Sequence, residues 1–232
     1  MTIAENLERL REEIAAACQR AGRDEREVAL MAVSKVHPVE AILEAYAAGQ
    51  RLFGENRVQE FQEKSARLRG LEGAEFHLIG PLQSNKTNKA AELFDAIDAV
   101  DSLKIAQRLE TAAKALGKRL PVLIEVKLSH EESKHGVAPG ELMGLLDEMR
   151  GFEAVEAVGL MTVPPWSEDA EVARPYFREL RRLRDEAAKV HPKVTQLSMG
   201  MTNDFAVGIE EGSSCVRVGT AIFGKRIYAK AT

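Results

Sequence analysis

The sequence has few of the residues that build disulfide or metal frameworks. Its 232 residues include only two cysteines, Cys18 and Cys215, which are too few and too far apart for a disulfide framework or a metal cluster. We expect both thiols to be buried, because cysteine is among the residues most often found inside proteins. Four of the five histidines fall in loops or at helix starts, without acidic or thiol companions at zinc-ligand spacing. The sequence therefore predicts no metal site.

Basic charge and long hydrophobic runs are also lacking. Lysine and arginine total 32 against 36 aspartates and glutamates, so there is no basic field to attract a nucleic acid. No apolar run approaches the roughly 20 residues that cross a bilayer, and the N-terminus is acidic and helical rather than a basic signal. These features predict a cytoplasmic protein with neither a nucleic acid nor a membrane as partner.

The first residues predict a helix. Ile3, Leu7 and Leu10 recur at helical spacing, and Thr2 with Glu5 has the arrangement of a capping box. We expect this helix within residues 1–22. An unbroken apolar run at 28–33 follows it, as in a parallel strand that is covered on both faces.

The rest of the chain alternates between strand-like and helix-like segments. Further apolar runs centre on Leu52, Leu78, Ile97, Ile124, Val158, Val194 and Val216. With the run at 28–33, about eight βα units emerge, which is the number that a closed barrel needs. Pro38 and Gly49 bracket the first helix that follows a strand. The pattern predicts an α/β fold, a single (β/α)8 TIM barrel spanning residues 1–232 as one domain, with an extra N-terminal helix.

Lys35 directly follows the first predicted strand, at the end of such a barrel where active sites lie. A lysine that is partly desolvated there has a lowered amine pKa and can form a Schiff base. Taken alone, Lys35 fits a surface lysine in a βα loop better than a Schiff-base lysine.

Two glycine-containing segments suggest a phosphate site. Residues 198–201 and 218–220 occupy the predicted loops after strands seven and eight, where barrels commonly bind phosphate. Ser198 and Thr220 offer hydroxyl donors there, and Gly200 and Gly219 let the backbone approach an anion. We expect Lys35 to face these loops across the barrel. Two ordinary βα turns remain the alternative.

Arg217 lies inside the last predicted strand, where an arginine is unfavourable unless something accepts its hydrogen bonds. A ligand contact is the interpretation we favour, with an internal salt bridge as the alternative. His77, in the third strand, is predicted to be a hydrogen-bonded core histidine. The glycine-rich fingerprint of dinucleotide binding is absent after the strands.

Segments along most of the chain resemble one known family, the pyridoxal phosphate homeostasis proteins, also called YggS or PROSC. The segments are AVSKVHPVEAI (32–42), FGENRVQE (53–60), FHLIGPLQSNK (76–86), SKHG (133–136), GLMTVPP (159–165), LSMGMTNDF (197–205) and VRVGTAIFG (216–224).

The resemblance implies the barrel of the N-terminal domain of alanine racemase, with pyridoxal 5′-phosphate held covalently as a Schiff base on Lys35. It assigns the phosphate to Ser198, Gly200, Gly219 and Thr220, and the pyridine nitrogen to Arg217. Asn56 and Met199 are implied as contacts to the ring or its edge. It further implies a monomeric carrier or regulator that is not an enzyme and has no catalytic residues, with pyridoxal-phosphate-dependent apoenzymes as recipients.

Two other functions remain open from the sequence. One is an amino-acid racemase-like enzyme with the same barrel and cofactor, although Tyr46, Tyr176 and Tyr228 fall on predicted helices or in the tail and offer no obvious second base. The other is a phosphosugar-binding barrel enzyme that uses the phosphate loops without the lysine. Lys134, after the fifth strand, is a candidate for secondary capture of the cofactor, with a solvated surface lysine as the alternative.

Overall fold

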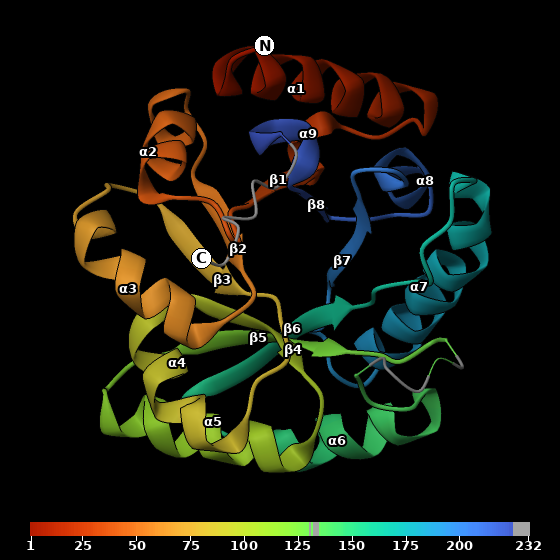
Figure 1. The fold of residues 1–232 in the computed structure, drawn as a ribbon. Helices are drawn as coiled ribbons and strands as arrows, with labels where there is room; N and C mark the ends of the chain where they lie inside the picture. Colours follow the sequence, from red (N-terminus) through yellow and green to blue (C-terminus); the bar gives the residue numbers. More distant parts are fainter. Residues whose placement is uncertain (130, 132–134, 225–232) are drawn as a thin grey trace.

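The computed structural model of the chain describes residues 1–129, 131 and 135–224. His130, Lys134 and Tyr228 lie outside the described residues, so the expectations for them stay predictions. Within the described part, parallel strands β1 to β8 pair in sequence order and close into a barrel, with helices around the outside (Figure 1). The closure joins β1 to β8, where Ala29 pairs with Cys215 and Met31 with Arg217.

The strands are β1 (Ala29–Val33), β2 (Leu52–Glu55), β3 (Glu75–Leu78), β4 (Ala96–Val100), β5 (Leu120–Glu125), β6 (Val155–Met161), β7 (Gln196–Met201) and β8 (Cys215–Val218). The helices are α1 (Ile3–Arg20), α2 (Val39–Ala47), α3 (Val58–Leu68), α4 (Thr87–Leu93), α5 (Leu103–Ala115), α6 (Leu142–Met149), α7 (Arg174–Ala188), α8 (Phe205–Glu210) and α9 (Thr220–Phe223). The predicted alternation and the barrel are confirmed.

Helix α1 is the predicted extra helix, and its start is fixed by the capping box. The Glu5 amide donates to Thr2 Oγ1 at 3.2 Å, and the Thr2 amide donates to Glu5 Oε2 at 2.7 Å. Its buried face packs beside α8 and α9, and Asn6 Nδ2 donates to the carbonyl of Ile222 at 2.9 Å. Because α8 and α9 are short, α1 supplies the apolar cover that this side of the barrel otherwise lacks (Figure 1).

The prediction was wrong for the seventh strand. Val194 is buried but precedes the strand, which runs from Gln196 to Met201 and contains a serine and a glycine. An apolar run marks a strand whose two faces are both packed on hydrophobic side chains. Strand β7 instead turns Ser198 toward a buried guanidinium, so its pattern is mixed.

Candidate functional site

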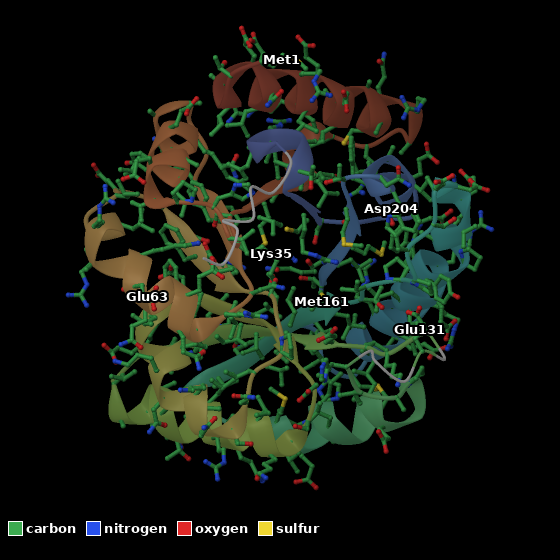
Figure 2. All side chains as sticks on the ribbon, viewed as in Figure 1. Met1, Lys35, Glu63, Glu131, Met161 and Asp204 are labelled. Atoms are coloured by element: carbon green, nitrogen blue, oxygen red, sulfur yellow. The ribbon has the colours of Figure 1, made fainter. Side chains whose placement is uncertain are left out.

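Lys35 is presented by a tight turn that follows β1. The Ser34 amide donates to the Gly54 carbonyl at 3.0 Å, which extends the pairing of β1 with β2 by one residue. The His37 amide then donates to the Ser34 carbonyl at 3.1 Å and closes a turn of residues 34–37. Lys35 occupies the second position of this turn and is half-buried. In Figure 2 its label lies inside the ring of helices, as does that of Met161, whereas Asp204 is labelled at the start of α8.

The third position of this turn carries backbone strain. Val36 has a φ of 61°, a left-handed conformation that β-branched residues rarely adopt. Glycine usually fills such a position in turns. Val36 is the one non-glycine residue with positive φ in the described part of the chain, and it directly follows Lys35. Strain of this kind persists only where surrounding contacts impose it, and it is concentrated at functional sites.

Arg217 is buried inside the barrel, with 4% of its surface exposed. Its Nη1 donates to Ser198 Oγ at 2.6 Å, and its Nη2 donates to the Thr162 carbonyl at 2.9 Å. Burial lowers the pKa of the guanidinium, although nearby acidic groups such as Asp98 and Asp204 oppose the shift. No carboxylate of the described residues forms an ion pair with Arg217, so the internal salt bridge is not what accounts for it.

The segment 198–201 is not a loop, which corrects the expectation drawn from the sequence. It lies within β7, and Ser198 is fully buried with its hydroxyl already bound to Arg217. The turn after β7 comes at residues 202–204, where Asp204 Oδ1 accepts from the Met201 amide at 2.6 Å. Thr202 and Asp204 in this turn were not singled out from the sequence, although the glycine-containing segment adjoins them.

Gly200 and Gly219 lie at places where a side chain would be crowded. Gly200 has a φ of 95°, and a Cβ there would lie 3.0 Å from the Cα of Phe205. A Cβ at Gly219 would lie 3.2 Å from the carbonyl oxygen of Val33, at the end of β1. Gly219 caps α9, whose first residue is the exposed Thr220. We had expected Lys35 to face these two strand ends across the barrel. Because β8 lies between β1 and β7, Lys35 instead lies beside them.

Asn56 and Met199 occupy different environments. Asn56 follows β2 and is half-buried, and a Cβ at Gly80 would lie only 2.4 Å from its carbonyl oxygen. The loop after β3 therefore packs directly on the Asn56 backbone. Met199 is fully buried in the main hydrophobic core, and strand alternation directs it away from the side that Ser198 occupies. This location does not favour a side-chain contact to a ligand inside the barrel.

A cluster of buried charges behind the Lys35 turn was not predicted. Ser34 Oγ donates to Glu55 Oε1 at 2.7 Å, and Lys64 Nζ donates to the same oxygen at 3.1 Å. Lys64 Nζ also donates to Glu60 Oε1 at 2.7 Å, and Glu60 Oε1 accepts from the Val36 amide at 2.6 Å. From the sequence, Glu60 and Lys64 resemble an ordinary exposed helical pair four residues apart. The burial of Lys64 could not be read from that spacing.

His77 is hydrogen-bonded as predicted. Its Nδ1 lies 3.1 Å from Asp98 Oδ1, and only 18% of its side chain is exposed. Burial disfavours the imidazolium, but the nearby carboxylates, Asp98 foremost with Glu75 and Asp95, together outweigh burial and raise the pKa of His77. The expectation of buried thiols is confirmed for Cys18 but is wrong for Cys215, which is half-buried as a residue. Desolvation of its thiol nevertheless raises the pKa of Cys215 to about 12.

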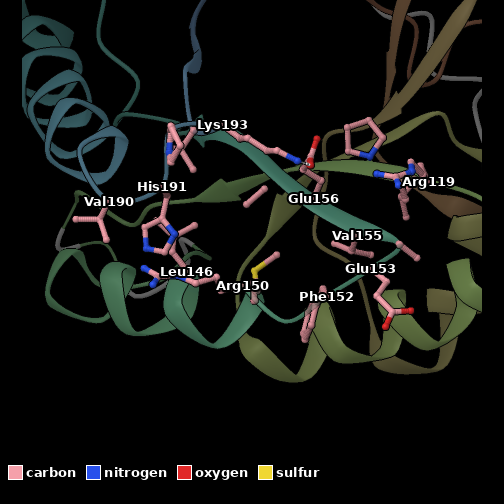
Figure 3. A pocket seen from close by; sticks show the side chains of 17 residues that line it. Arg119, Leu146, Arg150, Phe152, Glu153, Val155, Glu156, Val190, His191 and Lys193 are labelled. Atoms are coloured by element: carbon pink, nitrogen blue, oxygen red, sulfur yellow. Dashed lines mark hydrogen bonds and ion pairs between the residues drawn. The ribbon is translucent and has the colours of Figure 1, made fainter.

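A cavity of about 770 Å³ lies away from the Lys35 turn (Figure 3). It is lined by Leu120 and Val155 at the starts of β5 and β6, by the end of α6, and by the segment that leads into β7. In the close-up, Lys193 extends toward Glu156, with which it forms an ion pair. Large cavities are the usual first candidates for a site. In barrels, however, functional groups gather at the opposite ends of the strands, so we give the Lys35 end more weight.

Three further observations concern the membrane, metal ions and the tyrosines of the described residues. No helix there combines the length and the apolarity that a membrane crossing requires. Within the same residues, no group of three or more histidine, cysteine, aspartate or glutamate side chains is placed to hold a metal ion. Tyr46 donates to the carbonyl of Glu72 at 3.0 Å, and Tyr176 lies on α7, so both are on helices as expected.

Comparison with known proteins gives consistent matches over nearly the whole chain. Residues 6–227 match the family described as alanine racemase, N-terminal domain. A protein of Aquifex aeolicus named pyridoxal phosphate homeostasis protein is 43% identical over 229 residues, covering 98% of this chain and all of that protein. A protein of the same name from Escherichia coli is 43% identical over 234 residues, covering 98% of each chain.

Solved structures agree with these matches. PipY of Synechococcus elongatus, determined with PLP bound, superposes with a TM-score of 0.86 at 40% identity and covers 96% of this chain and all of its own. Alanine racemase of Clostridium difficile superposes with a TM-score of 0.76 at 16% identity, covering 97% of this chain and 56% of its own, which shows a shared fold only.

Proposed function

The chain belongs to the pyridoxal phosphate homeostasis protein family, and on that basis we propose that it binds pyridoxal 5′-phosphate at the Lys35 end of the barrel and acts in cellular homeostasis of this cofactor. Storage, protection and delivery of a reactive aldehyde are the tasks that such a site suits. Pyridoxal-phosphate-dependent apoenzymes are the recipients we propose, and a cytoplasmic monomer is the form we propose for the carrier.

One observation carries this proposal, which is the buried Arg217. A guanidinium inside a barrel is unfavourable unless its hydrogen bonds are accepted, and the described acceptors are only a hydroxyl and a carbonyl. A pyridine nitrogen is a neutral acceptor that suits a further N–H group of the Arg217 guanidinium. Ser198 and Thr162 keep the guanidinium in place, so we assign Ser198 to orienting Arg217 as well as to the phosphate side of the site.

Lys35 supplies the covalent link in this proposal. Its amine adds to the aldehyde carbon of the cofactor, a C=N bond replaces the C=O bond, and one water leaves, with no change of oxidation state. The reaction needs the neutral form of the amine.

The phosphate fits the neighbouring strand ends. Gly200 and Gly219 lack a side chain where a Cβ would press on the backbone of Phe205 and Val33, and the exposed Thr220 follows Gly219 directly. We therefore place the phosphate at Gly200, Gly219 and Thr220. Asn56 is a candidate contact to the ring edge, and Met199 could contribute through its backbone.

The residues around the site favour a carrier over a racemase-like enzyme. Bound pyridoxal phosphate supplies an electron-withdrawing ring, which stabilises a carbanion best when the ring nitrogen is protonated. A guanidinium stays protonated and can only donate, so Arg217 leaves that nitrogen without a proton. Of the described tyrosines, Tyr46 is engaged with Glu72 and Tyr176 is on α7, so neither provides a second base by the site.

The test is deuterium exchange at the α-carbon of several amino acids, with chiral analysis of the products and Lys35→Ala as the blank. We expect loaded protein to react reversibly with free amines while exchange at the α-carbon stays close to the blank. Sustained turnover that depends on Lys35, at about 1 per second or faster, would favour the racemase-like alternative.

A further inference from the structure

The Lys35 turn is held from two sides by side chains far away in the sequence. On one side the His37 ring packs on Phe223 of α9, with ring centroids 4.8 Å apart. On the other side stand Glu55 at the end of β2 and Glu60 and Lys64 on α3, which we call the Glu55–Glu60–Lys64 cluster.

The Glu55–Glu60–Lys64 cluster contacts the turn at consecutive residues. Glu55 accepts from the Ser34 hydroxyl at 2.7 Å, and Lys64 Nζ lies 3.3 Å from the Ser34 carbonyl. Glu60 accepts from the Val36 amide at 2.6 Å. The residue between them is Lys35, so the cluster holds the backbone immediately before and after it.

Burial shows that this arrangement is more than a surface ion pair. Glu55 is fully buried, and the side chain of Lys64 is only 10% exposed. Two carboxylates share one ammonium there, an arrangement that desolvation would normally oppose. The hydrogen bonds that offset this desolvation include those made with Ser34 and Val36, so the cluster and the turn depend on each other.

The strained conformation of Val36 indicates what Glu60 does in this cluster. A φ of 61° is unfavourable for valine, and the exposed side chain of Val36 gains little packing energy to offset this. The hydrogen bond from its amide to Glu60 holds this conformation in place, together with the hydrogen bond from the His37 amide to the Ser34 carbonyl that closes the turn. Without it, residue 36 would relax, and the preceding Lys35 would turn with it.

We infer that the Glu55–Glu60–Lys64 cluster positions Lys35 for its reaction with the cofactor aldehyde by holding Val36 in the left-handed conformation. The inference rests on the proposed function, because it concerns the lysine that forms the covalent link. The three residues are positioning residues, since they act through the turn.

A double-mutant cycle separates positioning from simple stability. The variants are Glu60→Ala, Val36→Gly and the two combined, with Glu63→Ala as the matched control on the same helix. Glu63 is exposed and is labelled on α3 in Figure 2. Glycine adopts positive φ without penalty, so Val36→Gly removes the need for the Glu60 contact. The measured quantities are the rate of loading of each full-length variant with pyridoxal phosphate, the share of borohydride-fixed label on Lys35, and the urea midpoint.

We expect Glu60→Ala to slow loading at Lys35 about tenfold, in keeping with the usual penalty of the left-handed conformation. In the Val36→Gly background the same substitution should cost about twofold or less, and Glu63→Ala should load at the unmodified rate. Equal losses in both backgrounds, or no loss with Glu60→Ala, would overturn the inference while leaving the proposed function intact. Absence of loading at Lys35 in the unmodified protein would instead refute the proposed function, and the inference with it.

Discussion

A few buried polar side chains lie inside this barrel. Arg217, Ser198 and the Thr162 carbonyl form a hydrogen-bonded group near one end, and His77 with Asp98 forms another. Asp98 influences both the histidine and the arginine, since it helps to raise the pKa of His77 and opposes the lowering of the Arg217 pKa by burial. The interior is therefore polar along part of its length, whereas the space between strands and helices is filled by the main hydrophobic core.

His77 should make stability depend on pH. Its pKa is raised in the folded state, so its stabilising contribution is fully present below its unfolded pKa and is lost as pH rises through the folded pKa. We expect the difference in free energy of unfolding between the unmodified protein and His77→Gln to be larger at about pH 6 than at about pH 9. Urea unfolding at both pH values measures it. A difference that does not change with pH would show that the Asp98 pairing does not raise this pKa.

At the scale of elements, the ends of strands and the turns that follow them build the proposed site. The loop after β3 packs on the loop after β2, because Gly80 approaches the Asn56 carbonyl too closely for any side chain. Helix α3 in turn fixes the loop after β1 through Glu60 and Lys64. Neighbouring βα loops thus determine each other's conformation.

Gly80→Ala tests this dependence. A Cβ placed 2.4 Å from the Asn56 carbonyl oxygen must displace backbone, so we expect a loss of about 1–3 kcal/mol in the free energy of unfolding. Binding of pyridoxal phosphate should also weaken, because Asn56 moves.

Gly144→Ala is the matched control for this substitution. Gly144 lies in α6 with no atom within 4 Å of an added Cβ, so alanine there should raise stability by about 0.5–1 kcal/mol. Urea unfolding and an equilibrium titration measure both variants. Equal behaviour of the two would mean that the loop after β3 does not constrain Asn56.

The sequence predicts best the elements whose residue pattern follows from one local cause, such as burial of both faces of a strand or capping of a helix. The apolar run at 28–33 becomes β1, and the capping box at Thr2 starts α1. Strand β7 was misplaced because one of its faces carries Ser198 rather than an apolar side chain. The conformation of Val36 and the burial of Lys64 depend on contacts between separate loops and helices, so no local sequence pattern predicts them.

At the scale of the whole molecule, the ring of helices leaves the strand ends near Lys35 as the proposed binding end, and α1 completes the cover over the short α8 and α9 (Figure 1). That residues 1–232 unfold as one domain stays a prediction. A single barrel shares its core among all units, so binding at one end should stabilise the entire fold.

Loading with cofactor should therefore raise the melting temperature in one cooperative transition. At about 100 times the dissociation constant, a ligand adds about 2.7 kcal/mol, which for a protein of this size corresponds to roughly 5–10 °C. Differential scanning calorimetry with and without pyridoxal phosphate measures the shift. Lys35→Ala should show a smaller shift at the same concentration. Two separate transitions, with only one shifted, would contradict the single domain.

The central claim is that Lys35 holds the cofactor covalently. The most direct test is borohydride reduction of the protein loaded with pyridoxal phosphate, followed by mass mapping of its peptides. We predict that the stable label is found on the peptide containing Lys35 and that Lys35→Ala loses it together with the borohydride-sensitive absorbance. Label spread over other lysines with Lys35 unmodified, or an unchanged chromophore in Lys35→Ala, would contradict the account.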